Sequence, residues 1–386
     1  MKRLLIKHFG PIKEASLLLG NVNIITGMQS SGKSCVLKLA CYCSWVEKRL
    51  QVTQKVNGFG KGTTFIDLLT KYYNIKGYIK DNTYLEYESD YLIFSYSHQK
   101  RQFSITWKNN LWAYKRAKVS YIPADRNLVA AIPGWSTLPL DGNMIDFMAN
   151  WDKARKFIKK EEDFLGLGMS YVYDSVANKD QILLKNSKPL MLRESSSGVQ
   201  SLLPMYIHLD YLLKGLYEDS NTQISYEKKE ERKNLLSLMY AKYQELQHSM
   251  DQTAISLTFE GVDYIFANQA DADSFATLYK NYTTSHHSEI FLEEPEDNLF
   301  PPTQCKFISW LVESVRQHND LLFITTHSPY VLNQFIKESP QNMQVLFTHK
   351  IDDEENLYAV KQLTEEEIRE IYDNGVDMFF NFELYV

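Results

Sequence analysis

Hydrophobic positions cluster in short runs at the start of the chain. The runs RLLIKHF (3–9) and ASLLLG (15–20) are separated by the turn-forming GPIKE, and NVNIITG (21–27) is an apolar run that ends on glycine. These runs predict buried strands over residues 1–26. The segment KSCVLKLACYCSWVEKRL (33–50) has apolar side chains at helical spacing and no proline, which predicts a helix. The chain therefore opens with strand, glycine loop and helix.

The middle of the chain is more polar. Between about residues 60 and 125, alternating pieces such as YLEYESDYLIFSYS and FSITW predict antiparallel strands, and VSYIPADR predicts another strand ending in a turn. Residues 143–165 are expected to be helical, and YVYDSV, QILLK and LMLRE resemble short strands. Residues 199–216 predict a helix with a broad apolar face, and the polar segment 217–250 predicts a solvated helix or helical hairpin.

The last third alternates buried strands with a helix. SEIFLEEPE and DLLFITTHSP predict strands, and PPTQCKFISWLVESVRQ between them predicts a helix. This alternation favours a parallel core sheet, so the predicted fold class is α/β, with a mixed or parallel core sheet, an antiparallel β subdomain and an inserted helical lobe. We expect one domain over residues 1–386. Its expected parts are an N-terminal lobe (1–130), a helical lobe (131–255) with the polar insertion 217–250, and a C-terminal lobe (256–386).

Composition limits the classes of function. With 44% hydrophobic residues, the 386-residue chain can bury a sizeable core, and its net charge of −6 does not indicate a nucleic-acid binder. A local basic run is followed directly by EED, which favours a solvated helix face over a DNA site; it comprises Lys153, Arg155, Lys156, Lys159 and Lys160. The four cysteines are interpreted as reduced or buried thiols rather than as a metal site. No run is long enough to span a membrane and the start is not a secretory signal, so we expect a cytoplasmic protein.

GMQSSGKS, from Gly27 to Ser34, fits the phosphate-binding pattern G-x-x-x-x-G-K-[ST]. Its glycines let backbone N–H groups approach phosphate oxygens, Lys33 supplies a positive charge, and the Ser34 hydroxyl can bind Mg²⁺. The loop also opens a helix, whose amides and dipole favour anions. We expect ATP to contact the whole loop and the residue after it: Gly27, Met28, Gln29, Ser30, Ser31, Gly32, Lys33, Ser34 and Cys35.

Two later strands end in residues that suit phosphate chemistry. IFLEEPEDNLFP (290–301) ends a hydrophobic run with Glu293 and Glu294, and LLFITTHSP (321–329) places His327 after another. A carboxylate beside the phosphate loop can hold Mg²⁺, and a second can orient the attacking water. An imidazole there can contact the γ-phosphate. The expected catalytic residues are therefore Glu294, His327 and Lys33.

In these motifs the chain resembles the ABC-type ATPases of the SMC/RecF/OLD group, often called AAA family ATPases. GMQSSGKS resembles the Walker A motif of that group, LEEPEDNLFP its Walker B motif and TTHSP its His switch. The resemblance implies ATP and Mg²⁺ as cofactors, Ser34 and Glu293 as metal ligands, Glu294 as catalytic base and Asp297 in the D-loop. Glu293 stands where many relatives have Asp, so turnover is expected to be slow.

SSSGVQS (195–201) resembles the ABC signature, with Ser197, Gly198 and Gln200 in the matching positions and Val199 in place of the second glycine. The resemblance implies that this segment completes the site of a second copy, giving an ATP-sandwich homodimer. YIPADRN (121–127) falls at the Q-loop but lacks its glutamine. Asp125 or Arg126 is a candidate to replace it as a metal-shell or phosphate-sensing group, and a simple turn is equally compatible.

The biological role is open between three hypotheses. The chain lacks long SMC-type arms, and the residues after His327 are too few for the Toprim nuclease of OLD-type members. The leading hypothesis is the sensor or clamp ATPase of a bacterial anti-phage defence system, acting with a separately encoded effector such as a nuclease or toxin. The alternatives are a RecF-like DNA-repair ATPase that binds nucleic acid directly, and an ATP-dependent scaffold with little hydrolysis.

Overall fold

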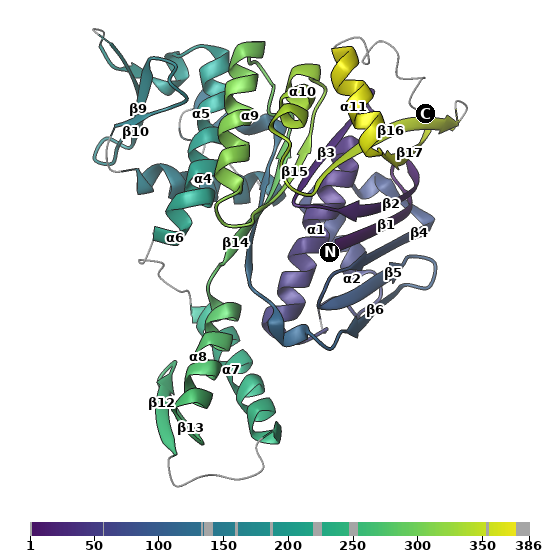
Figure 1. Cartoon of the computed structure of the whole chain (residues 1–386), viewed down its shortest axis with the longest axis vertical. Coiled ribbons are helices and arrows are strands. Elements are labelled where there is room, and N and C mark those ends of the chain that lie inside the picture. The colour runs from purple at the N-terminus through teal and green to yellow at the C-terminus, as the bar shows by residue number, and fades with distance from the viewer. Residues whose placement is uncertain are drawn as a thin grey trace.

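A computed structural model describes residues 2–56, 58–132, 134, 142–158, 161–185, 188–218, 226–246, 254–352 and 355–375. Within these ranges the largest sheet has eleven strands in the order β6-β5-β4-β1-β2-β17-β16-β3-β15-β14-β7 (Figure 1). Its strands are β1 (Lys2–Phe9), β2 (Ile12–Leu19), β3 (Val22–Gly27), β4 (Ile79–Glu88), β5 (Leu92–Ser97), β6 (Gln102–Trp107), β7 (Ala117–Ile122), β14 (His287–Glu293), β15 (Leu321–Thr325), β16 (Met343–Asp352) and β17 (Leu357–Gln362).

The sheet is parallel at one end and antiparallel at the other. Strands β16, β3, β15, β14 and β7 run parallel to their neighbours in this order, whereas β1, β2, β4, β5 and β6 form an antiparallel arm. A smaller antiparallel sheet has the order β11-β10-β9-β8. Its strands are β8 (Glu162–Asp163), β9 (Met169–Asp174), β10 (Lys179–Leu184) and β11 (Leu190–Met191). The predicted α/β class, with a mixed core sheet and a separate antiparallel part, is confirmed.

Helices cover both faces of the parallel strands. Those of the main body are α1 (Lys33–Thr53), α2 (Thr64–Tyr72), α3 (Leu128–Ala131), α4 (Gly142–Phe157), α5 (Ser197–Asp210), α6 (Leu216–Glu218), α9 (Pro301–Val315), α10 (Pro329–Glu338) and α11 (Glu365–Asn374). Short helical turns are η1 (Lys76–Tyr78), η2 (Leu111–Ala113), η3 (Ala124–Asn127), η5 (Leu192–Glu194) and the π-helical η6 (Tyr211–Gly215). In Figure 1, α4, α5 and α9 lie to one side of β14 and β15, and α1 lies beside β3.

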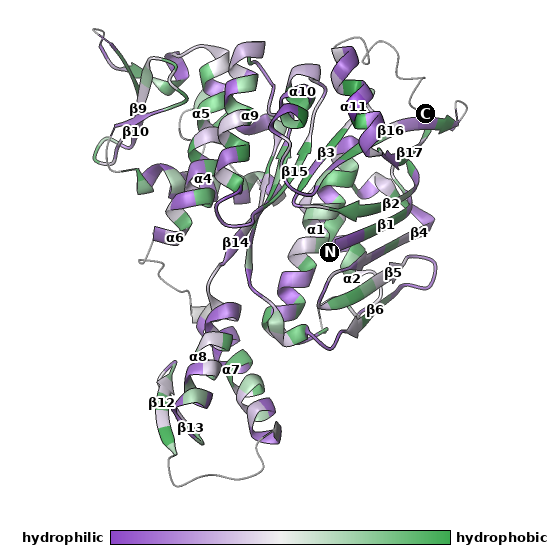
Figure 2. Ribbon diagram, viewed as in Figure 1, coloured by the Kyte–Doolittle hydropathy of each residue, from purple (hydrophilic) through white to green (hydrophobic). Residues whose placement is uncertain are grey.

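Alternating side chains of the central strands fill two cores. Ile24, Leu292 and Ile324 belong to the core shared with α4, α5, α9 and α10, whereas Ile25 and Phe291 belong to the core shared with α1 and α2. Successive side chains of a strand point to opposite faces of the sheet, so a strand that is buried on both faces contributes to both cores. In Figure 2, hydrophobic residues accordingly concentrate in strands such as β2, β5 and β15.

Two parts of the chain differ from the sequence expectation. Residues 64–72 form α2 within the region expected to contain strands, because Phe65, Ile66 and Leu69 bury one face of a helix against the aromatic core. The helix expected over 143–165 ends at Phe157, and Glu162–Asp163 begin the small sheet as β8. The antiparallel strands expected between residues 60 and 125 are confirmed as β4, β5 and β6.

A separate module projects from the body at the bottom of Figure 1. It consists of α7 (Tyr226–Leu246), β12 (Ile255–Phe259), β13 (Val262–Phe266) and α8 (Gln269–Thr283), and has its own aromatic core around Phe266 and Phe275. It therefore spans residue 255, the expected end of the helical lobe. The polar segment 217–250 supplies α7, and residues 219–225 and 247–250 lie outside the described residues. The body contacts the module through bonds such as the 2.9 Å ion pair between Arg49 Nη1 and Glu231 Oε1.

We expect Phe266→Ala to unfold this module locally. Phe266 is fully buried in the module core, and its truncation should cost about 3–5 kcal/mol. Amide hydrogen exchange should accelerate in α7 and α8 and remain unchanged in β3 and β15. Val262→Ala, on the exposed side of the same strand, is the matched control and should leave exchange unaffected. Equal acceleration throughout the body would contradict an independent module core.

Candidate nucleotide site

Parallel pairing brings three loops to one edge of the sheet. Strands β3, β15 and β14 end at Gly27, Thr325 and Glu293, and each pair is parallel, so the residues that follow them meet. A pocket of about 620 Å³ lies there. It is lined by Pro11, Gln29, Ser30, Ser31, Gly32, Lys33, Ser34, Cys35, Tyr78, Glu294 and His327. The structure thus brings most of the expected phosphate loop together with Glu294 and His327, and adds Pro11 and Tyr78.

The loop needs glycine at two positions. Gly27 has φ of 143° and Gly32 has φ of 93°, both in the region that disfavours other residues. A Cβ on Gly27 would also lie 2.2 Å from Thr348 Oγ1. Ser31 fixes the loop from inside, because its hydroxyl donates to the carbonyl of Met28 at 2.6 Å and contacts the Thr348 hydroxyl. Gly32 is the N-cap of α1, so the first amides of α1 are directed to the pocket.

Lys33 folds back onto the loop. Its Nζ donates to the carbonyls of Gly27 at 3.0 Å and Met28 at 2.6 Å. Burial lowers the pKa of Lys33 to about 8, while the nearby carboxylates of Glu294 and Glu296 act in the opposite direction. The ammonium is therefore held by two neutral acceptors and is destabilised by loss of water. Phosphate oxygens would provide stronger partners.

Glu293 is a buried acid at the end of β14. Its Oε2 accepts from the Ala124 amide at 3.3 Å, and its Oε1 lies 3.5 Å from Lys38 Nζ with no hydrogen bond to a described residue. It does not line the pocket, whereas Ser34 does. A buried carboxylate oxygen that lacks a hydrogen bond, with a hydroxyl on the adjacent loop, is an all-oxygen donor set of the kind Mg²⁺ prefers. The residues present therefore fit the expected metal.

Glu294 and His327 face each other. Glu294 has φ of 42°, its amide donates to the Thr325 carbonyl at 3.0 Å, and its Oε1 lies 3.1 Å from His327 Nε2. The hydrogen bond to His327 is the main cause that lowers the pKa of Glu294, so its carboxylate is ionised near neutral pH. The strained backbone turns this side chain into the pocket.

Glu296 holds the His327 segment in place. Its Oε1 accepts from the His327 amide at 2.5 Å and from the Thr326 hydroxyl at 2.9 Å. Burial raises the pKa of Glu296, against the lowering effect of these hydrogen bonds. The sequence motifs assign no role to Glu296. It is a positioning residue, because it joins the loop after β14 to the loop after β15.

Arg126 joins the same loop to α5. Its guanidinium is fully buried and donates to the carbonyls of Glu293 at 2.8 Å and Glu294 at 2.7 Å. The same side chain donates to the carbonyls of Pro123 at 3.2 Å and Ser201 at 3.3 Å. Asp125 is exposed, and neither residue lines the pocket. In this structure Arg126 therefore positions the loop and makes no direct approach to the phosphate site.

The signature-like segment begins α5. The Ser196 hydroxyl accepts from the Val199 amide at 3.4 Å and caps the helix, and Gln200 Nε2 donates to the carbonyls of Arg193 and Ser195. The expected helix opening is thus confirmed, with Ser197 as its first residue. A Cβ on Gly198 would lie 3.0 Å from the Asn298 carbonyl, so α5 packs closely on the loop after β14.

The signature-like residues are placed apart from the phosphate loop of their own chain. Ser197, Gly198 and Gln200 do not line the pocket, and neither does Asp297. Burial raises the pKa of Asp297, although Arg126 partly offsets this effect. The N-terminus of α5 therefore does not contribute to the pocket at the N-terminus of α1.

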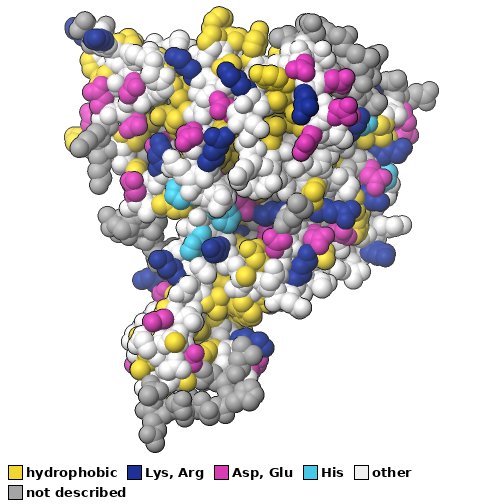
Figure 3. Space-filling view, in the orientation of Figure 1, with side chains coloured by type: hydrophobic (Ala, Val, Ile, Leu, Met, Phe, Trp, Pro, Cys, Tyr) yellow, Lys and Arg dark blue, Asp and Glu magenta, His cyan; other side chains and the backbone are white. Residues whose placement is uncertain are grey.

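The basic run in α4 is largely used within the fold. Arg155 is buried and pairs with Asp152 at 2.7 Å and Asp180 at 2.9 Å, and Lys156 pairs with Asp152. Lys153 lies over the Tyr211 ring, and Lys159 and Lys160 lie outside the described residues. In Figure 3, positive and negative side chains are interspersed over the face shown. Among the described residues of the run, Arg155 is therefore not an open phosphate contact, whereas Lys156 is exposed.

The other sequence candidates have structural positions. Cys35, Cys41 and Cys43 are buried free thiols in the second core, and Cys305 is half-buried. Burial raises the pKa of Cys35, which lies on the pocket wall, to about 12, so its thiol stays protonated. None of the helices in the described part of the chain has the length and apolar character needed to cross a membrane.

No protein-family model matches the chain, and no curated protein matches its sequence. Among solved structures, the chain is similar to the SMC head domain from Thermotoga maritima, at 10% identity and a TM-score of 0.43, over 94% of this chain and 98% of that one. It is also similar to an Smc head bound to the C-winged helix domain of ScpA, at 8% identity and a TM-score of 0.43, over 95% and 98%. The recombination mediator RecF follows, at 12% identity and a TM-score of 0.32, over 94% and 97%. None of these similarities assigns a function to this chain.

We expect nucleotide binding to take up a proton near pH 8. In the free protein Lys33 loses its proton as the pH rises through about 8, and phosphate contact should raise this pKa, so binding should weaken above that pH. Calorimetry with MgATP in two buffers of different ionisation enthalpy measures the uptake. Lys38→Gln, which keeps Lys33, should retain it. A proton count of zero at pH 8 would show that Lys33 is not the phosphate-contacting group.

Arg126→Met should loosen the loop after β14. The substitution keeps an apolar stem and removes the donors of four buried carbonyl contacts, so we expect a loss of about 3 kcal/mol or more in the free energy of unfolding. Urea denaturation measures the loss, and hydrogen exchange should accelerate at residues 293–298. Arg155→Met, at another buried arginine, is the matched control. It should destabilise the protein without changing exchange at residues 293–298.

Proposed function

We propose that this protein binds and hydrolyses MgATP in the pocket between the phosphate loop and the loops after β14 and β15. One observation carries the proposal: Lys33 lies in the same pocket as the paired Glu294 and His327. A phosphate-binding cation on one wall and an ionised carboxylate on another are what attack by water on a terminal phosphate requires.

The phosphate loop supplies the phosphate contacts. The amides of residues 29–34 and the N-terminus of α1 are the donors, and Lys33 leaves the carbonyls of Gly27 and Met28 for the phosphate oxygens. Ser34 and Glu293 are the metal ligands in this proposal. Bound there, Mg²⁺ neutralises charge on the phosphates. Lys38, now 3.5 Å from Glu293, would have to yield part of that contact.

Tyr78 is the proposed stacking surface for the base. It lines the pocket beside Pro11, is 37% exposed, and packs edge-on against Phe9. A partly exposed aromatic ring that packs on another ring gives a flat surface in the pocket wall. The proline and the ring together would favour a planar heterocycle, which agrees with a nucleotide as the ligand.

Glu294 is the proposed group that orients the attacking water. His327 keeps Glu294 ionised and fixes its direction at 3.1 Å. Once triphosphate occupies the pocket, the imidazole can turn to the γ-phosphate and release one carboxylate oxygen to the water. Glu296 and Arg126 hold the backbone of both residues, so the exchange of partners is confined to two side chains.

The signature-like end of α5 is the proposed contact to a second copy. Ser197, Gly198 and Gln200 do not line the pocket of their own chain, yet they form a serine- and glycine-rich helix N-terminus. A head-to-tail homodimer would place this end over the triphosphate of its partner, with Asp297 at the seam. ATP would then be bound from both sides.

The proposed role is that of a sensor or clamp in the bacterial cytoplasm, acting in anti-phage defence with a separately encoded effector such as a nuclease or toxin. Support comes from the motif resemblance and from the use of Arg155 in internal ion pairs, which removes one phosphate contact expected of a RecF-like repair ATPase. A scaffold with little hydrolysis is the second alternative, and Glu293 in place of aspartate is the feature that favours it.

Glu294→Gln tests these proposals together. We expect ATP turnover to fall at least about 100-fold, while MgATP binding persists and light scattering after size exclusion shows a stable dimer. Lys33→Ala should abolish binding and the dimer. Ser197→Arg should bind MgATP as a monomer, because it blocks only the partner's side.

The alternatives give different results in the same assay. Glu294→Gln that stays strictly monomeric with MgATP would refute the homodimer. If the wild-type protein dimerises with ATP, and Glu294→Gln does not change its ATP turnover, the scaffold alternative would be supported. Nucleotide binding that survives Lys33→Ala would refute the proposed site itself.

A further inference from the structure

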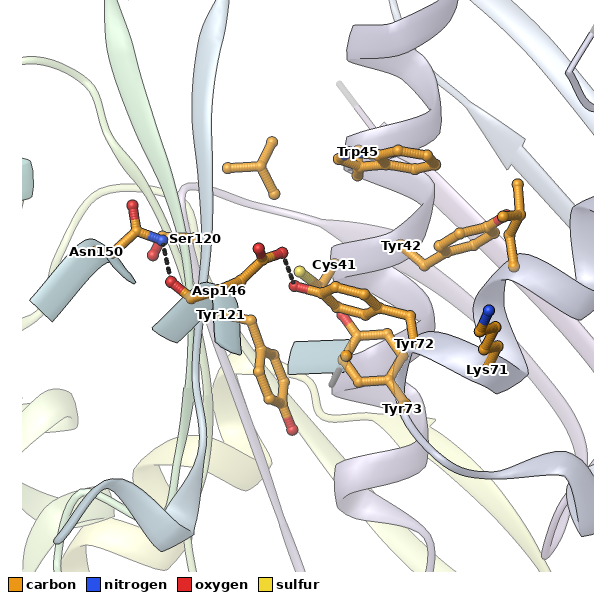
Figure 4. Close-up of a pocket in the computed structure, with 13 residues that line it drawn as sticks. Cys41, Tyr42, Trp45, Lys71, Tyr72, Tyr73, Ser120, Tyr121, Asp146 and Asn150 are labelled. Atoms are coloured by element: carbon orange, nitrogen blue, oxygen red, sulfur yellow. Dashed lines mark hydrogen bonds between the residues drawn. The ribbon is translucent and has the colours of Figure 1, made fainter. Parts of the chain in front are cut away.

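A second pocket of about 400 Å³ lies beside the edge strand β7. Its walls come from α1, α2, β7 and α4, with the C-cap residue of α2 (Figure 4). It shares no lining residue with the nucleotide pocket. The volume is that of a small-molecule site, and no step of the proposed ATPase uses it.

Aromatic side chains form most of the wall. Tyr42 and Trp45 of α1 stack with ring centres 5.7 Å apart, and Tyr72 and Tyr73 meet edge-on at 4.7 Å. Trp45 is 37% exposed and Leu68 is 40% exposed, so an apolar wall is open to solvent. Among the described residues, no lysine or arginine lies over these four rings. Tyr42 and Tyr73 are almost fully buried, so the ring surface open to a ligand belongs to Trp45 and Tyr72.

Asp146 is the acidic residue among those that line this aromatic pocket. The Asp146 side chain points toward Tyr72 and Cys41 in Figure 4, and its Oδ2 accepts from the Tyr72 hydroxyl at 2.7 Å. Asn150 Nδ2 donates to the Asp146 backbone carbonyl at 2.7 Å and fixes this turn of α4. Asp146 forms no ion pair with a described lysine or arginine. Asp146 is exposed and its carboxylate is oriented by Tyr72, so its remaining acceptor sites are open to a ligand.

The other polar groups do not compete for that charge. Burial raises the pKa of Cys41 to about 12, so its thiol remains neutral, and burial also raises the pKa of Tyr72, so its hydroxyl remains a donor. Asn150 Oδ1 already accepts from Lys118 Nζ at 2.9 Å. Lys71 lines the pocket but makes no ion pair with Asp146.

We propose that this pocket binds a small organic cation, an ammonium attached to a flat or apolar body. The ammonium pairs with Asp146 and lies against the aromatic rings, and the body fills the space between Trp45, Leu68 and Tyr72. Aromatic faces attract cations through their quadrupoles, and this attraction grows when water is displaced. A carboxylate within the same wall adds a charge-assisted hydrogen bond. An anionic ligand would be repelled by the Asp146 carboxylate.

Three probes of equal shape and different charge test the assignment. Calorimetry on the full chain uses 2-phenylethylamine as the cation, 2-phenylethanol as the neutral form and phenylacetate as the anion. We expect the amine to bind at least about tenfold more tightly than the alcohol, with no binding of phenylacetate. Asp146→Asn keeps an acceptor for the Tyr72 hydroxyl and removes the charge. In this variant the amine and the alcohol should bind with about equal affinity.

Two further variants separate this site from the nucleotide pocket. Trp45→Ala should weaken both the amine and the alcohol, because it removes wall area. Lys33→Ala, which abolishes ATP binding in the proposed function, should leave amine binding unchanged. Equal affinity for amine and alcohol, tighter binding of phenylacetate, or amine binding that Asp146→Asn does not alter would each overturn the proposal. Unfolding curves confirm that each variant is folded before it is scored.

Discussion

Parallel strand pairing places three loops at one edge of the sheet. The hydrogen bonds between strands end where those loops begin. Beyond Glu293 and Thr325, the backbone needs other partners. The buried guanidinium of Arg126 supplies them by donating to carbonyls of Glu293, Glu294, Pro123 and Ser201. One side chain thus connects the acids of the nucleotide pocket to the edge strand β7 and to α5, and each of these elements takes its position relative to that contact.

The Arg126 guanidinium also offsets the repulsion between neighbouring carboxylates. Glu293, Glu294, Glu296 and Asp297 lie within five consecutive positions, and their mutual repulsion would spread the loop. Lys38 and His327 each pair with one of these acids, Glu296 Oε1 accepts from a backbone and a hydroxyl donor, and Arg126 places its charge among all four. The acids are therefore fixed without a bound ligand, which would reduce the reorganisation that the proposed catalysis needs.

Local sequence patterns predicted the site residues that directly follow a buried strand. The glycine loop, the acids after β14 and the imidazole after β15 could all be located, because each directly follows an apolar run. Tyr78 and Glu296 could not, and Arg126 was a candidate only for a metal-shell or phosphate-sensing role. Tyr78 reaches the pocket only because Gly10 bonds to its carbonyl, and the roles of Arg126 and Glu296 depend on partners in distant loops. Strands β16 and β17 were not predicted either; β17 pairs with β16 nearby in the chain and with β2 across almost its whole length.

Helix α1 links the two pockets. It begins at Lys33 and carries Trp45 twelve positions later, about 18 Å along a rigid rod. Helix α4 supplies Asp146 to the second pocket and packs on α5, which carries the signature-like residues. A ligand bound between α1 and α4, as proposed above, would therefore connect the helix that follows the phosphate loop with a helix that packs on α5. The edge strand β7 completes the connection, since it lines that pocket and continues directly to Arg126.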